Sequence, residues 1–101
     1  MTTAEDAALR LVSLLEQLAC TETSIAIVEP LADDEPTRAH LAGLRQTAAQ
    51  VREQIAEIVA VLPTYDAEWR CAAADRLMAT RTGCNADFHE HAAQILTIDL
   101  A

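Results

Sequence analysis

Apolar residues near the start of the chain recur at the spacing of an α-helix. They form one stripe along a helix, which comprises Ala8, Leu11, Val12, Leu15, Leu18 and Ala19. Thr3 is a candidate N-cap, and the acidic residues that follow it favour the positive end of the helix dipole. The stretch 21–28 is rich in β-branched residues, which lower helix propensity. The pattern predicts a helix from Ala4 to about Val28, and it leaves open an earlier end after Cys20.

The most regular pattern follows a turn at residues 29–37. Seven positions alternate at intervals of three and four residues, namely Leu41, Leu44, Ala48, Val51, Ile55, Ile58 and Leu62. This is the a/d seam of a heptad repeat, sustained over three repeats. Asp33 or Asp34 can cap the helix, Pro36 is tolerated in its first turn, and Pro63 ends it. We therefore predict a long helix from Pro36 to Leu62.

Two shorter helices complete the expected fold. The third starts at Thr64 or Asp66 and ends at Gly83, and the fourth starts after an Asn85 cap. Short connections favour antiparallel neighbours. The sequence predicts a single all-α domain over residues 1–101, an antiparallel bundle of about four helices, or of three if the segment after Cys20 breaks away.

Some apolar residues lie outside the main stripes of the first two helices. They are Leu9, Leu14, Val59 and Val61. A four-helix bundle needs one apolar stripe per helix, so this surplus requires further cover. Pairing two copies along the long second helix would supply it. The leading prediction is a non-enzymatic protein–protein interaction module that forms a homodimer.

Three arginines stand in one column beside the heptad seam. Arg38, Arg45 and Arg52 are seven residues apart and occupy the e position of the heptad. On one interpretation, the column pairs with carboxylates of another subunit or partner. On the other, it pairs with Glu16, Glu22 or Glu29 of the first helix, or lies in solvent, where ion pairs contribute little.

The chain is strongly acidic, with 16 Asp and Glu against seven Arg and a net charge of −9. This balance disfavours direct binding to nucleic acid or to anionic lipid. The densest acidic cluster is Asp33, Asp34 and Glu35. It suggests an alternative function, a small inhibitor that binds a basic, nucleic-acid-binding protein complex, of the anti-defence kind that phages encode. The other interpretation is a solvated turn that carries an N-cap.

Cysteines and histidines suggest a second alternative, a thiol- or metal-dependent activity around Cys71, Cys84 and His91. His89 and His91 point about 200° apart on a helix, so the two cannot bind one ion. No zinc or di-iron motif is present, and we expect no metal and no cofactor. We expect His91 to pack beside Phe88 and Ile95, with His89 near the surface.

The start of the chain does not resemble an export signal, because Glu5 and Asp6 stand where a signal peptide is basic. No window approaches about 18 uncharged apolar residues, the minimum for a membrane span. We therefore expect a cytoplasmic protein that does not bind membranes. Many alanines together with the absence of lysine suggest a GC-rich genome, bacterial or phage.

Overall fold

The computed structural model describes residues 3–100 and shows an all-α protein. Four helices span these residues, α1 (Ala4–Val28), α2 (Glu35–Val61), α3 (Ala67–Ala79) and α4 (Ala86–Thr97). Single 3-10 turns follow three of them, η1 (Glu29–Leu31), η2 (Leu62–Thr64) and η3 (Gly83–Asn85). The expected fold class, a packing of four helices with antiparallel neighbours, is confirmed.

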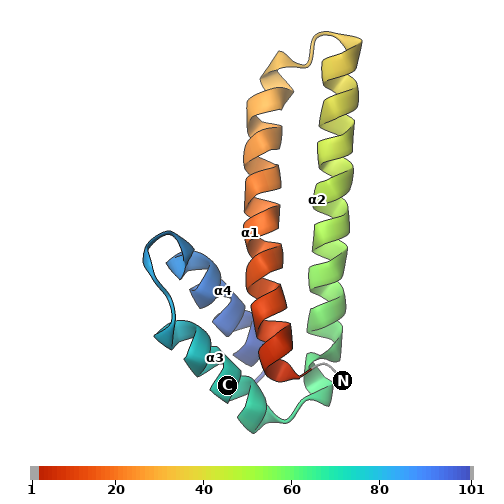
Figure 1. Ribbon diagram of the computed structural model, residues 1–101. Coiled ribbons are helices and arrows are strands. Elements are labelled where there is room, and N and C mark those ends of the chain that lie inside the picture. The colour runs from red at the N-terminus through yellow and green to blue at the C-terminus, as the bar shows by residue number, and fades with distance from the viewer. Residues whose placement is uncertain (1–2, 101) are drawn as a thin grey trace.

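The helices form two antiparallel hairpins of unequal length (Figure 1). The long hairpin of α1 and α2 gives the molecule its greatest dimension, 52 Å against 29 and 24 Å for the other two. The short hairpin of α3 and α4 packs across the first half of α1, on the side away from α2. The far halves of α1 and α2 therefore project beyond it as a two-helix arm, whose tip is η1 and the residues up to Glu35.

The core is built around the first half of α1. Adjacent residues are buried in pairs there, Ala7 with Ala8, Leu11 with Val12, and Leu14 with Leu15. Neighbouring residues on a helix point about 100° apart, so such pairs make a sector too broad for one partner helix. Accordingly α1 packs against α2 and also against α3 and α4.

The first helix continues to Val28, which confirms the predicted end at about Val28 and not the alternative end after Cys20. Thr3 closes a capping box, because its hydroxyl accepts from the Asp6 amide while the Asp6 carboxylate accepts from the Thr3 amide. In the β-branched stretch, the hydroxyls of Thr21 and Thr23 each donate to the carbonyl four residues earlier. These side chains therefore satisfy their hydrogen-bonding groups without leaving the helix.

The long second helix also matches its prediction to within one residue at each end. Asp34 is its N-cap and accepts hydrogen bonds from the amide and the hydroxyl of Thr37, at 3.3 and 2.5 Å. All seven positions of the heptad seam are buried or half-buried. The seam faces α1 of the same chain, because α2 packs extensively against α1 and has at most marginal contact with α3 and α4.

Two side chains join α3 to α4 by reciprocal bonds. Arg70, in the first half of α3 and only 2% exposed, donates from Nε to the Leu96 carbonyl at 2.9 Å and from both Nη atoms to the Asp99 carboxylate. His89, near the start of α4, bonds through Nδ1 to the Leu77 carbonyl at 2.9 Å. Both carbonyls lie in the last turn of a helix, where intrahelical partners are missing. Each helix thus caps the end of the other.

The structure corrects two predictions, the burial of the two histidines of α4 and the end of α3. His89 is buried and His91 is exposed, the reverse of what we expected. The inward face of α4 is His89, Ala92, Ala93 and Leu96, and Phe88 is only half-buried. The third helix ends at Ala79 rather than at Gly83, which instead opens η3 with a positive φ of 40°.

Replacing Arg70 tests the join between α3 and α4. We expect Arg70→Met to lower the free energy of unfolding by about 2 to 4 kcal/mol, because the buried Leu96 carbonyl loses its donor. Arg81→Met is the matched control, since the exposed Arg81 lies 3.5 Å from Glu90 and should cost at most about 1 kcal/mol. Urea denaturation followed by circular dichroism measures both. Equal losses would contradict a special role for Arg70.

The same join makes stability depend on pH. The hydrogen bond from Arg70 lowers the pKa of the Asp99 carboxyl below its ordinary value of 3.8. Its stabilising effect is therefore complete above pH 3.8 and is lost as pH falls through the lowered pKa. In urea denaturation, wild type should exceed Asp99→Asn by a constant margin from pH 7 to 5, and the margin should shrink below pH 4. A margin that does not change with pH would refute this assignment.

Candidate interaction surfaces

The outward side of α2 is a long, regular surface that no other described helix covers. Seven exposed residues recur there at intervals of three and four, which we call the outer seam: Ala39, Ala42, Gln46, Ala49, Glu53, Ala56 and Ala60. Its spacing repeats that of the heptad seam, which we call the inner seam because it faces α1, but on the opposite side of the helix. Our sequence analysis missed it, although the signal was the heptad spacing of the five alanines.

The arginine column is engaged within the chain. Arg45 pairs with Glu29 and Arg52 pairs with Glu22, each at 2.8 Å, and all four side chains are more than half exposed. Arg38 donates to the backbone carbonyl of Asp33 at 2.7 Å. The column therefore closes one edge of the α1–α2 arm, in line with the interpretation that pairs it with the first helix.

The acidic cluster lies at the tip of the arm, far from α3 and α4 (Figure 1). Asp33, Asp34 and Glu35 are all exposed. The bonds from Thr37 occupy Asp34 and lower the pKa of its carboxyl. Within residues 3–100, neither the Asp33 nor the Glu35 carboxylate has a hydrogen-bonding or ion-pairing partner. Two carboxylates of the cluster thus remain available to another molecule.

The apolar surplus is only partly covered. Leu14 is buried in the core, so the chain itself uses part of the surplus. Leu9, Val59 and Val61 remain exposed. Further exposed apolar side chains, which sequence analysis did not single out, lie at the arm tip (Ile27 and Leu31), at the start of α3 (Trp69) and beyond α4 (Ile98).

The cysteines and histidines of the second alternative lie on the surface. Cys71, Cys84 and His91 are all exposed, and none of the three cysteines forms a disulfide. Across residues 3–100, no cluster of three or more His, Cys, Asp or Glu side chains is arranged to hold a metal ion. His89, which is buried, forms a hydrogen bond with the Leu77 carbonyl of α3.

One helix is long and apolar enough to cross a membrane by its length and composition alone, α1 together with η1 (Ala4–Leu31). Only 22% of its apolar 18-residue window is buried, so the packing of α1 accounts for only part of this composition. Glu16 and Glu22 interrupt its middle, where a bilayer makes charge costly.

No protein-family model matches the chain, and no curated protein or solved structure matches it.

A charge swap tests where the arginine column binds. Arg52→Glu should lower the free energy of unfolding by about 0.2 to 1 kcal/mol, since it sets two carboxylates against each other on the surface. The double variant Glu22→Arg/Arg52→Glu should regain most of this loss in thermal unfolding experiments. Absence of any recovery would show that Arg52 and Glu22 do not pair in solution.

Proposed function

We propose that the chain is a non-enzymatic, cytoplasmic protein–protein interaction module that self-associates through α2. The main support is that α2, a helix of 27 residues, packs against α1 on one side only and presents the outer seam on the other. Small side chains let two helices approach to the short end of the usual 8–10 Å separation. The inner seam is occupied by α1, so a second copy meets the outer seam.

The outer seam is complementary to itself when two copies run antiparallel. A two-fold axis beside Ala49 sets Ala42 opposite Ala56 of the second copy. The same register places Gln46 within one residue of Glu53 of the second copy, so that an amide donor can reach a carboxylate acceptor. A symmetric dimer requires this kind of matching, because both copies use one surface.

The dimensions of α2 predict a weak dimer. A helix of this length extends about 40 Å, and with a contact strip about 10 Å wide it covers about 400 Å² per copy. Stable interfaces bury about 800 Å² per partner. We therefore expect dissociation constants in the micromolar range, consistent with a module that assembles and separates as its concentration changes.

The arm tip supports a second candidate function, the inhibitor that binds a basic, nucleic-acid-binding protein. Its support is the exposed Asp33 and Glu35 carboxylates at the far end of the molecule. In this alternative, the double variant Asp33→Lys/Glu35→Lys abolishes partner binding. Asp34 is left intact in the test because it caps α2.

Sedimentation equilibrium at 5 to 100 μM tests self-association. We expect wild type to change from monomer towards dimer over this range. Ala42→Glu/Ala56→Glu should remain monomeric, because it opposes two carboxylates across the proposed interface. Ser13→Glu/Gln17→Glu is the matched control, since it adds the same charge at exposed positions of α1 and should dimerise as wild type does.

Two outcomes would refute the proposal. One is a wild-type protein that stays monomeric at 100 μM. The other is a loss of dimer in the α1 control equal to that in the α2 variant. The Asp33→Lys/Glu35→Lys variant should still dimerise, and its loss of dimer would move the interface to the arm tip.

A further inference from the structure

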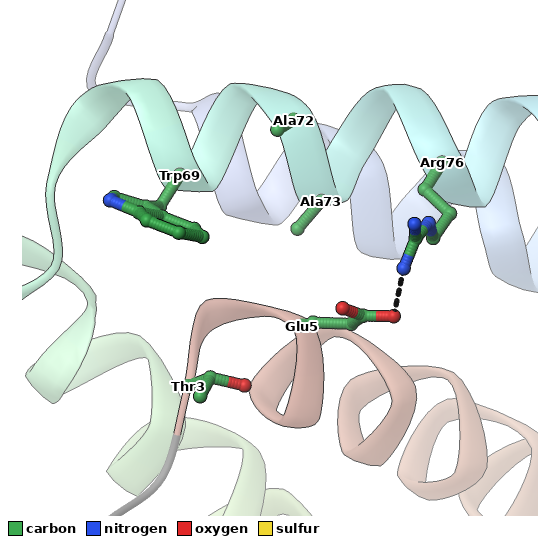
Figure 2. A pocket seen from close by; sticks show the side chains of 6 residues that line it. All are labelled: Thr3, Glu5, Trp69, Ala72, Ala73 and Arg76. Carbon is green, nitrogen blue, oxygen red and sulfur yellow. Dashed lines mark hydrogen bonds and ion pairs between the residues drawn. The ribbon is translucent and has the colours of Figure 1, made fainter.

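The single tryptophan of the chain, Trp69, is 68% exposed in the first turn of α3. Figure 2 shows its indole ring projecting from α3 into the space beside the start of α1. An exposed indole gains little from folding, because burial of apolar area is what stabilises a fold. Tryptophan is instead enriched among the residues that dominate the energetics of binding.

Two hollows adjoin the indole. The first, of about 240 Å³, is lined by Thr3, Glu5, Trp69, Ala72, Ala73 and Arg76. The second, of about 340 Å³, is lined by Glu68, Trp69 and Ala72. Each hollow thus combines an indole wall, at least one alanine and one glutamate. Both are open to solvent and large enough for the end of a long side chain.

The charges around these hollows are predominantly negative. Carboxylates come from the first turn of α1 (Glu5 and Asp6) and from the start of α3 (Asp66 and Glu68). The arginine that lines the first hollow, Arg76, is already paired with Glu5. Within residues 3–100 no side chain pairs with Glu68. A cation at the indole would therefore meet an unneutralised carboxylate beside it.

We propose that Trp69 and Glu68 form a docking site for an arginine side chain of a basic protein segment. A guanidinium is planar and weakly hydrated, so it can stack on the indole face. Its N–H groups can donate to the Glu68 carboxylate at the same time. The small side chain of Ala72, which lines both hollows, leaves room for the aliphatic part of the arginine side chain.

The site is independent of the proposed dimer. It lies on α3 and the start of α1, whereas the outer seam lies on α2, which has at most marginal contact with α3. A dimer would carry two copies of the site, and a partner with repeated arginines would gain avidity from both. The site is available whether or not the chain self-associates.

The sole tryptophan makes the test direct. A decapeptide of alternating arginine and serine, with both termini blocked, is titrated into the full chain while tryptophan emission is recorded. We expect a saturable change in emission that weakens as salt is raised. A peptide with citrulline in place of arginine keeps the planar group without the charge, and we expect it to produce no saturable change.

Variants then locate the bound peptide, with binding measured by fluorescence anisotropy of labelled peptide. Trp69→Ala should weaken binding about five- to thirty-fold, the range for a partly desolvated cation on an indole. Glu68→Gln should also weaken binding several-fold, because the guanidinium loses its charge-assisted hydrogen bonds to the carboxylate. Glu35→Gln removes the same charge at the arm tip and should change binding less than two-fold. Circular dichroism confirms that all three variants fold.

Three results would overturn the proposal. They are binding of the arginine peptide without a change in Trp69 emission, equal binding of the citrulline peptide, and a loss of binding in Glu35→Gln as large as that in Glu68→Gln. The last result would show that the net charge of the molecule, rather than this site, attracts the peptide. Sedimentation equilibrium of Trp69→Ala distinguishes failure of this site from failure of the proposed dimer, because we expect the variant to self-associate as wild type does.

Discussion

The fold depends on the packing of one helix against all three others. The first half of α1 buries residues in adjacent pairs, and this broad apolar sector receives α2 on one side and the α3–α4 hairpin on the other. The short hairpin is in turn closed by Arg70 and His89, each of which caps the opposite helix. The α3–α4 hairpin covers only the first half of α1 and lies on the side away from α2, so the arm and the outward side of α2 have no further cover. The exposed surfaces of the molecule follow from where this shared core stops.

The helices themselves were largely readable from the sequence, for identifiable reasons. The heptad seam of α2 is long enough that the period outweighs individual propensities, and Asp34 and Pro63 mark its ends. The β-branched stretch of α1 was ambiguous because its local propensity opposes a helix. Packing against α2 and hydroxyl bonds such as that of Thr21 to the Gln17 carbonyl maintain the helix there.

The joins between helices were not readable in the same way. A buried arginine gives no periodic signal, and the partners of Arg70 lie 26 and 29 residues away. Which of His89 and His91 is buried depends on which face of α4 meets α3. The large side chains of Phe88 and Ile95 suggested the wrong face. Small residues decide it instead, since Ala92 and Ala93 allow close approach. The outer seam was missed for a related reason, because alanine serves equally as core residue, surface residue and helix former.

The central functional claim is that a second copy covers the outer seam in the antiparallel register centred on Ala49. Disulfide cross-linking tests it most directly, in a background where the three exposed cysteines, Cys20, Cys71 and Cys84, are replaced by serine. A cysteine at position 49 should cross-link to itself, because disulfides need Cα atoms about 4.4 to 6.8 Å apart. Cysteines at 42 or 56 should not, yet a mixture of these two proteins should form the mixed dimer. Equal cross-linking at all three positions, or none at 49, would contradict the proposed interface.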